Sequence, residues 1–389
     1  MTSNDELLTR AVSDVVPRAV ADSKLKTGEK MRIYFGIDPT GTKLHLGHSV
    51  PLRKMRAFQD AGHHVILLIG SFTAMIGDPT GRDEMRQELT AEDVKKNFET
   101  YIEQAKLILD MKKLEVRYNH EWLGKLSFKE ILGLTSHFTV QQMLKRDMFA
   151  KRLKEDNPIS VTEFMYPLMV GYDSVVLDVD CEIGGNDQLF NMLAGRTMQH
   201  AHKKRDKFVL TTKLIDGTDG RKMSKTYSNC VYLTDSAEEM YGRLLSMPDA
   251  LIPVYMECCT DLPMTEVKAA EKALKDGKEN PKNLKMRLAR EIVTIYHSAE
   301  AAKTAEAAFE NVFKNKGVPE DMPEYKAKKG ESLIDALLGS GTVLSKSEAR
   351  RLIEQGGVKV GDVVVKSVDA KAETGVVRVG KRKFVKIFL

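Results

Sequence analysis

Two histidines, His45 and His48, stand three positions apart in the stretch KLHLGHS. Side chains three apart share one face of a helix, so the pair could bind a metal, pack in a core or contact a phosphate. No HExxH pattern or third ligand accompanies them, which weakens the metal interpretation. The N-terminus of a helix offers free N–H groups to anions, and Gly47 lets a ligand approach the backbone. Imidazoles there could donate to a phosphate as charge develops on it.

A second group of polar residues lies far downstream, in DGRKMSKT. Lys222 and Lys225 lie on either side of Ser224 in a loop that contains glycine. Lysines on such a loop can close over a polyphosphate and neutralise it in the transition state. A basic loop on its own is more often simply solvated. Combined with the upstream histidine pair, it favours chemistry on a nucleotide triphosphate.

Alternating apolar runs and helix-like stretches must position these groups. The apolar, β-branched runs are 32–37, 64–70 and 174–185. The helix-like stretches that follow them are 48–61, 91–110 and 187–202. This repetition predicts an α/β domain with a parallel sheet and helices on its faces, whose ligands bind at the carboxyl ends of the strands. Neither GxGxxG nor GxxxxGK[ST] occurs, so the commonest dinucleotide and NTPase motifs give no support.

Changes in composition divide the remainder of the chain. Alanine, lysine and glutamate with helical spacing follow the first domain, then a polar segment with Pro and Gly, then two short helices and hairpin strands. The predicted parts are a Rossmann-like catalytic domain (1–230), an α-helical domain (231–315), a linker (316–330) and a small α+β domain (331–389).

Charge and cysteine content narrow the class of protein. The 389 residues carry a net charge of +5, and residues 331–389 alone hold eleven Lys/Arg against seven Asp/Glu. Such a basic tail is typical of nucleic-acid binding, although a solvated tail would look the same. No apolar run approaches the roughly 18 residues that span a bilayer, and the N-terminus resembles no leader. The expectation is a cytoplasmic protein whose four cysteines are reduced, mostly buried and not part of a zinc site.

Together, HLGH and KMSKT resemble the paired signatures of class I aminoacyl-tRNA synthetases. HxGH alone is shared with small-molecule nucleotidyltransferases, so the second signature makes the resemblance specific. Over essentially its full length the chain is similar to bacterial-type tyrosyl-tRNA synthetases. The matching stretches are YFGIDPTGTKLHLGH (34–48), IGDPTGR (76–82), TEFMYPLMVGYDS (162–174) and EIGGNDQ (182–188).

That resemblance implies three sets of site residues. The tyrosine-binding set is Tyr34, Asp78, Tyr166, Val170, Asp173 and Gln188. The set acting on the ATP phosphates is Thr40, His45, His48, Lys222 and Lys225. The set holding the rest of ATP is Asp38, Gly47, Gly184, Gly185, Asp187, Met223, Ser224 and again Lys225. Taken one at a time, the acidic residues could instead cap helices, and the tyrosines could be core aromatics.

In the family, the residues at Tyr34 and Asp173 both bond the substrate phenol. A donor and an acceptor around a hydroxyl are left unpaired when phenylalanine enters, which penalises the wrong substrate, and tyrosyl-tRNA synthetases are the established example of this effect. Val170 departs from the family pattern, which has a glutamine that accepts from the substrate ammonium. Because valine cannot accept, affinity and stringency at this position are in question.

The C-terminal stretch SKSEARRLIEQGGVKVGD is similar to S4-type RNA-binding modules. Such modules grip RNA phosphates with basic side chains on a pair of helices, and the residues in question are Lys346, Arg350, Arg351 and Lys359. Another basic run, KRDMFAKRLK (145–154), is interpreted as a solvated helix or as a contact for the tRNA acceptor stem.

The resemblance implies a homodimeric ligase with ATP, carrying Mg²⁺ on its phosphates, L-tyrosine and a tRNA as substrates, and no protein-bound metal. Two rivals stay open. A nucleotidyltransferase making a small dinucleotide would give no role to the KMSKT loop or the basic tail. A non-catalytic RNA-binding protein on a synthetase scaffold would not need intact histidines and loop lysines.

Overall fold

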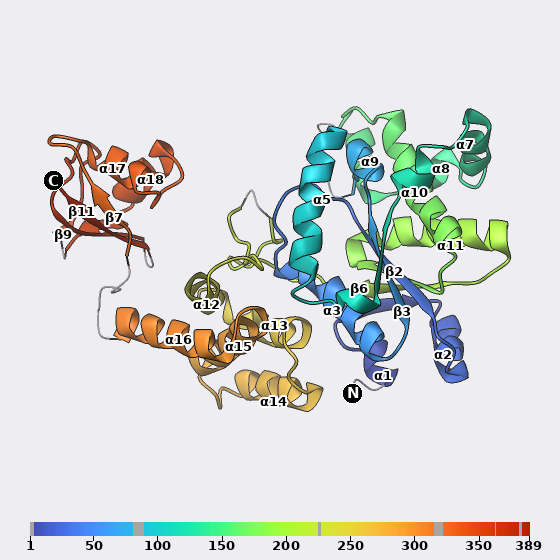
Figure 1. The fold of residues 1–389 in the computed structure, drawn as a ribbon, viewed down its shortest axis with the longest axis horizontal. Coiled ribbons are helices and arrows are strands. Elements are labelled where there is room, and N and C mark those ends of the chain that lie inside the picture. The colour runs from blue at the N-terminus through green and yellow to red at the C-terminus, as the bar shows by residue number, and fades with distance from the viewer. Residues whose placement is uncertain (1–3, 81–88, 225–226, 315–321, 362, 381–382) are drawn as a thin grey trace. The chain divides into compact units, whose positions relative to one another are not determined.

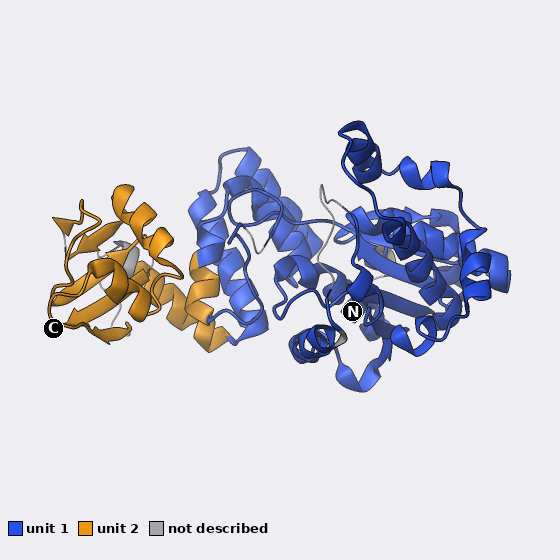
Figure 2. Ribbon diagram, turned by 90° about the horizontal axis from the view of Figure 1, so that it is seen from above, with its two compact units in different colours: residues 1–236, 243–298 blue, residues 237–242, 299–389 orange. Residues whose placement is uncertain are grey.

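The computed structural model describes residues 4–80, 89–224, 227–314, 322–361, 363–380 and 383–389. The chain forms two compact units (Figure 2): residues 1–236 with 243–298, and residues 237–242 with 299–389. None of the described helices combines the length and the apolar character that a membrane span requires.

The first unit is built on a six-stranded sheet (Figure 1) with the order β1-β6-β5-β2-β3-β4. Its strands are β1 (Val12–Val16), β2 (Arg32–Ile37), β3 (His64–Ile69), β4 (Leu114–Tyr118), β5 (Cys181–Gly185) and β6 (Phe208–Thr212). All neighbours pair in parallel except β1, which runs antiparallel to β6 at one edge. Strands β3 and β6 are buried along nearly their whole length, as expected for strands covered on both faces. The predicted α/β architecture is confirmed.

The apolar run at 174–185 is not one strand, because its first residues belong to a helix. Helix α10 (Val161–Leu177) covers the start of this run and ends where Asp178 adopts a left-handed conformation, with φ of 48°, and only the end of the run forms strand β5. Val175 packs with Met198 of helix α11 (Leu189–Lys203). This packing overrides the strand preference of a β-branched residue. The apolar-run criterion also misses β1, β4 and β6; in β1 and β4 charged side chains interrupt the pattern.

The other two helix-like stretches lie close to their expected positions. Helix α3 (Leu46–Asp60) begins two residues before the predicted start, and α5 (Ala91–Ala105) ends five residues before the predicted end. The remaining helices of this part of the chain are α1 (Asn4–Leu7), α2 (Arg18–Thr27), α4 (Thr73–Ile76), α6 (His120–Leu123), α7 (Phe128–Thr135), α8 (Val140–Leu144) and α9 (Asp147–Lys154).

A helical region follows, as its alanine- and lysine-rich composition predicts. It comprises α12 (Ala237–Leu245), α13 (Ile252–Cys259), α14 (Met264–Lys275), α15 (Pro281–Tyr296) and α16 (Ala299–Lys314). Of these helices, α16 belongs to the second compact unit, and α13 to α15 belong to the first. All four cysteines of the chain are free and buried.

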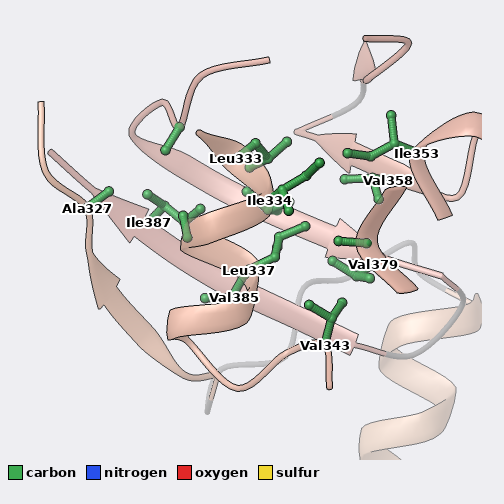
Figure 3. Close-up of a cluster of buried hydrophobic side chains, with 14 residues drawn as sticks. Ala327, Leu333, Ile334, Leu337, Val343, Ile353, Val358, Val379, Val385 and Ile387 are labelled. Atoms are coloured by element: carbon green, nitrogen blue, oxygen red, sulfur yellow. The ribbon is translucent and has the colours of Figure 1, made fainter. Parts of the chain in front are cut away.

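The C-terminal part is a small α+β domain, as predicted. Its five-stranded sheet has the order β7-β11-β10-β8-β9. The strands are β7 (Glu324–Lys326), β8 (Val358–Val360), β9 (Val363–Val364), β10 (Gly375–Val379) and β11 (Lys383–Phe388). Two helices, α17 (Leu333–Gly339) and α18 (Lys346–Glu354), share one apolar core with the sheet (Figure 3), in which Leu337, Ile353 and Val385 are almost fully buried.

Candidate active site

A cavity of about 540 Å³ opens at the carboxyl ends of β2 and β5. This is the position where open parallel sheets bind ligands, and its volume suits a small organic substrate. The predicted site residues that line it are Tyr34, Asp38, Thr40, His45, Gly47, His48, Asp78, Tyr166, Val170, Asp173, Gly184, Gly185, Asp187, Gln188, Lys222 and Met223. Ser224 lies next to this set along the chain, and Lys225 lies outside the described residues.

One end of the cavity is dry and hydrogen-bonded. Tyr34 and Asp173 are 1% and 2% exposed. The Asp173 carboxylate accepts from Trp122 Nε1 at 2.7 Å and from Asn119 Nδ2 at 3.2 Å. The Tyr34 hydroxyl lies 3.0 Å from Ser174 Oγ. Burial raises the pKa of Asp173 well above its usual range, although the bonds from Trp122 and Asn119 oppose this. We call this the phenol end.

Asp38 joins the phenol end to the neighbouring helix. Its Oδ2 accepts from the Tyr166 hydroxyl at 2.8 Å, and its Oδ1 accepts from Thr73 Oγ1 at 2.7 Å. A Cβ at Gly70 would lie 1.9 Å from Asp38 Oδ1, so only glycine leaves room for this carboxylate. Burial and the charges of Asp38 and Asp78 raise the pKa of Tyr166 well above the usual value. The resemblance implies that Asp38 contacts ATP, and the structure ties it to Tyr166.

Asp78 and Gln188 form a second polar group on the wall of the cavity. Gln188 Nε2 donates to Asp78 Oδ2 at 2.6 Å, and Asn191 Nδ2 donates to Gln188 Oε1 at 2.8 Å. Thr80 donates to the other oxygen of Asp78 through its backbone N–H and its hydroxyl. Arg146 NH2 in turn donates to Thr80 Oγ1 at 3.1 Å. Sequence reasoning places Asp78 and Gln188 here but misses Thr80, Arg146 and Asn191.

The opposite end of the cavity begins at the N-terminus of α3. His45 is its N-cap, and the His45 backbone N–H donates to His48 Nδ1 at 3.2 Å. The two imidazole rings lie 3.8 Å apart between centroids. A Cβ at Gly47 would approach the His45 ring to 3.0 Å, so glycine allows the ring to fold over the helix start. Within the described residues no three His, Cys, Asp or Glu side chains are grouped as metal ligands would be. We call this the phosphate end.

Lys222 and Met223 of the KMSKT loop line the phosphate end, and the described part of this loop is hydrogen-bonded to its own base. Asn229 Oδ1 accepts from the Ser224 backbone N–H at 2.8 Å, while Asn229 Nδ2 donates to Asp219 Oδ1 at 2.7 Å and to the Lys222 carbonyl at 3.1 Å. The hydrogen bond from Asn229, together with those from the backbone N–H and the side chain of Arg221, lowers the pKa of Asp219 to about 2. Lys222 Nζ lies 3.5 Å from Asp187 Oδ2. The lysine predicted for phosphate and the carboxylate predicted for the ribose are therefore paired with each other.

Two glycines make the floor of the cavity under this loop. A Cβ at Gly184 would lie 2.7 Å from the Met192 sulfur, and one at Gly185 would lie 2.7 Å from Asp187 Oδ1. Both glycines end strand β5, so the sheet edge and the absence of side chains together create the space.

The cations of the small C-terminal domain lie on its surface. Lys346, Arg350 and Arg351 are exposed on α18, and Lys346 Nζ forms an ion pair with Asp335 at 2.7 Å. Lys359 is half-buried on β8, directly opposite Arg378 of β10. The predicted RNA-binding cations therefore occupy one helix and an adjacent strand, and the register adds Arg378 to them.

The basic run 145–154 differs from a solvated helix in a specific way. Arg152 is fully buried on α9 and forms an ion pair with Glu163 at 2.7 Å. Arg146 is 8% exposed and lies over the Phe190 ring at 4.5 Å; burial lowers its pKa to about 10. Two of the cations in this run thus stabilise the wall of the cavity.

Comparison with the sequence models of known families shows to which class of protein the chain belongs. The sequence model of the class I tRNA synthetases of the tryptophan and tyrosine group matches residues 26–314, and that of the S4 domain matches residues 334–377. With the HLGH and KMSKT segments at one end of the cavity, the fold and site define a class I aminoacyl-tRNA synthetase.

Comparison with individual proteins identifies the family within this class. The chain is 45% identical to the tyrosine–tRNA ligase of Thermotoga maritima, over 98% of this chain and 96% of the relative. It is 47% identical to that of Geobacter metallireducens, over 94% and 93%. A mitochondrial tyrosyl-tRNA synthetase from Aspergillus nidulans shares the fold, with a TM-score of 0.67 at 24% identity over 80% of this chain and 95% of that chain. The chain belongs to the tyrosine–tRNA ligase family.

Proposed function

We propose that the cavity activates L-tyrosine with ATP, releasing pyrophosphate, and then passes tyrosine from the adenylate to the terminal adenosine of its tRNA. The observation that carries this proposal is that a single cavity has a buried phenol end at Tyr34 and Asp173 and a phosphate end at His45 and Lys222. A tyrosine side chain requires the first environment, and a triphosphate requires the second.

At the phenol end, the Asp173 carboxylate accepts from the substrate hydroxyl and the Tyr34 hydroxyl donates to it. Asp173 already accepts one N–H on each oxygen, and each carboxylate oxygen has a second lone pair available. Asp78, Tyr166 and Gln188 surround the position of the substrate amino and carboxylate groups. Their mutual hydrogen bonds preorganise the acceptors that the ammonium needs.

At the phosphate end, the tyrosine carboxylate attacks the α-phosphorus of ATP and pyrophosphate leaves. No protein nucleophile takes part, so the chain contributes positioning and charge stabilisation. His45, His48 and Thr40 act on the phosphates, together with the loop residues Lys222 and Lys225, the latter outside the described residues. The substrate is the magnesium complex of ATP, with the cation held by its phosphates. Gly47, Gly184 and Gly185 make room for the nucleotide, whose ribose contacts Asp187 once Lys222 has left it.

Further proposals concern assembly. Large apolar side chains are exposed on the helices from α7 to α10: Phe128, Leu132, Val140, Leu153 and Val161. Exposed apolar surface of this extent marks an interface, which supports a homodimer formed through these helices. Sedimentation equilibrium on the full chain tests this, and a monomer at micromolar concentration would contradict it. We also propose that the enzyme acts in the cytoplasm, where translation consumes charged tRNA.

ATP–pyrophosphate exchange with each of the twenty amino acids tests the activity. We expect exchange with tyrosine alone. Exchange with a nucleotide substrate instead would favour a dinucleotide-forming transferase, and no exchange at all would favour a non-catalytic RNA-binding protein.

The division of labour along the chain has its own test. We propose that residues 1–230 activate tyrosine, that 231–315 form a helical domain and 316–330 a linker, and that 331–389 bind RNA through Lys346, Arg350, Arg351 and Lys359. Deleting residues from 328 onward should leave pyrophosphate exchange intact while impairing tRNA charging. The salt dependence of tRNA binding should also weaken, because phosphate contacts are lost. Unimpaired charging by the shortened chain would exclude this role.

A further inference from the structure

Beside Tyr34 lies a buried charged network, one member of which, Glu182, also lines the cavity. Lys207 precedes β6 and is 0% exposed, and its ammonium forms an ion pair with Glu182 of β5. The same ammonium donates to Ser174 Oγ of α10 at 2.5 Å. Ser174 is itself 0% exposed. The network therefore joins β5, the start of β6 and α10 beside Tyr34.

The atoms around this network are closely packed. Gly195 of α11 packs on it so closely that a Cβ there would lie 2.4 Å from Ser174 Oγ and 2.7 Å from Lys207 Nζ. The Lys207 ammonium also lies 5.5 Å from the centre of the Tyr34 ring. A buried ion pair of this kind is weak evidence for stability, because the desolvation of two charges offsets their attraction. Its position beside a phenol that is proposed to bind the substrate indicates a role in that binding.

Hydrogen counting at Ser174 supplies that explanation. A serine hydroxyl has one proton to donate and can accept two. Lys207 is a donor only, so Ser174 Oγ accepts from it. The single Ser174 proton then has two acceptors within reach: Glu182 Oε2 at 3.3 Å and the Tyr34 oxygen at 3.0 Å. Glu182 Oε2 already accepts from the Lys207 ammonium, which leaves the Tyr34 oxygen as the closer and less occupied acceptor.

The polarity of this bond decides what Tyr34 can do. If Ser174 donates to the Tyr34 oxygen, the Tyr34 proton is left for another acceptor, and the two within reach are Glu182, which already accepts from Lys207, and a substrate hydroxyl in the cavity. If instead Tyr34 donated to Ser174, it could offer the substrate only an acceptor, beside the Asp173 carboxylate, which is also an acceptor. A substrate phenol has one proton and could not satisfy both. Burial and the charges of Glu182 and Asp173 raise the pKa of Tyr34 well above its usual value, so the phenol keeps its proton.

We propose that Ser174, Lys207 and Glu182 are positioning residues that fix Tyr34 as a hydrogen-bond donor, and that this network sets the discrimination between tyrosine and phenylalanine. Lys207 occupies Glu182 and one lone pair of Ser174, Ser174 donates to Tyr34, and Tyr34 donates to the substrate. This inference rests on the proposed contact of Tyr34 and Asp173 with the substrate phenol.

The test compares kcat/KM for tyrosine and for phenylalanine in pyrophosphate exchange. Ser174→Ala leaves the Lys207–Glu182 ion pair in place and removes only the hydroxyl. We expect the tyrosine-to-phenylalanine ratio to fall about three- to tenfold, the change that one neutral hydrogen bond produces. The loss should appear in KM for tyrosine, with the phenylalanine values unchanged. A general loss of structure would lower both substrates together. An unchanged ratio would overturn the proposal.

Thr211→Val is the matched control. Thr211 is also 0% exposed and lies on β6, but its hydroxyl contacts the backbone of Asp14 at the other side of that strand. We expect its substrate ratio to equal that of the unchanged protein. A fall equal to that of Ser174→Ala would show that any buried hydroxyl has this effect, and would overturn the proposal.

A second variant tests the charged part. Lys207→Met combined with Glu182→Gln removes both charges together, so that neither is left buried alone. The Ser174 proton can then turn to the new amide oxygen, Tyr34 turns to Ser174, and the substrate ratio should fall as in Ser174→Ala. A folded double variant with the original ratio would overturn the role of Lys207. Tyr34→Phe shows whether a failure concerns the network or Tyr34 itself. If Tyr34→Phe leaves the substrate ratio intact, the proposed function of Tyr34 fails. If the ratio falls in Tyr34→Phe but in neither network variant, only the role of the network is refuted.

Discussion

The two ends of the cavity present their polar groups in opposite ways. At the phenol end, Tyr34 and Asp173 are almost fully buried and each is held by neighbours on other elements. At the phosphate end, Lys222 and Asp187 are exposed, and they are paired with each other. Buried groups keep one arrangement because unpaired alternatives are costly, while exposed pairs exchange partners at little cost. On the proposed function, selectivity therefore belongs to the buried end, and charge stabilisation of the reaction to the end that can rearrange.

His45→Ala breaks this comparison at the phosphate end and should have the largest effect. Removing one preorganised donor from a developing charge slows a reaction by about 100- to 1,000-fold. We expect tyrosyl-adenylate formation in single-turnover experiments to slow by that amount, while the dissociation constant of tyrosine stays within about twofold. A large rise in that constant with an unchanged rate would place His45 in substrate binding instead.

Asp173→Asn acts at the opposite end. A hydrogen bond to a charged acceptor contributes about 1.5–3 kcal/mol, so tyrosine should lose about 10- to 150-fold in kcat/KM while phenylalanine changes little. Steady-state exchange with both amino acids measures the ratio. Equal losses for the two substrates would mean that Asp173 supports the fold of the pocket and does not bind the hydroxyl of the substrate tyrosine.

These contrasts also explain what the sequence can and cannot reveal. The signatures identify Tyr34, Asp78 and Gln188 because each lies within a short stretch of the chain that matches the family: Tyr34 within β2, Asp78 after α4 and Gln188 after β5. The partners Asn119 and Trp122 lie more than fifty residues from Asp173 in the chain, and no local pattern connects them to it.

Ser174, Glu182 and Lys207 escape sequence reasoning for the same reason. Each looks ordinary in its own stretch, and the three meet only because α10, β5 and β6 pack together. The run at 174–185 illustrates the limit at the level of the fold, since its apolar pattern predicts that a strand starts at Ser174, which lies instead near the end of α10. Its position there, next to Asp173, is what turns its hydroxyl toward Tyr34.

Asp173 also makes the stability of the protein depend on pH. Because burial raises its pKa in the folded state, the folded chain binds more protons than the unfolded chain above the ordinary aspartate pKa of about 3.9. As the pH rises from that value towards the raised pKa of Asp173 in the folded state, this group therefore contributes less to the stability of the fold. In thermal unfolding from pH 4.5 to 8, we expect Asp173→Asn to gain in Tm relative to the unchanged protein as the pH rises.

The comparison uses the change of Tm with pH, because Asp173→Asn also replaces an acceptor of Asn119 with a donor on one side. If the Tm difference between Asp173→Asn and the unchanged protein is constant with pH, Asp173 ionises in the folded state as it does in the unfolded chain.

The smallest expected effect concerns Val170, which sharpens the boundary between the two ends. Val170 lines the cavity and packs against the apolar cluster that contains Tyr34 and Tyr166. It lies one helical turn beyond Tyr166 on α10, so both side chains share a face, and position 170 is within reach of the substrate ammonium.

With valine at position 170, we expect water to take the third ammonium proton. Val170→Gln should then tighten tyrosine binding by about tenfold, and by less if that water is well ordered. Discrimination against phenylalanine should hardly change, because both substrates carry the same ammonium. Titration of both amino acids into both proteins measures this, and unchanged or weaker tyrosine binding would mean that the cavity already satisfies the ammonium in another way.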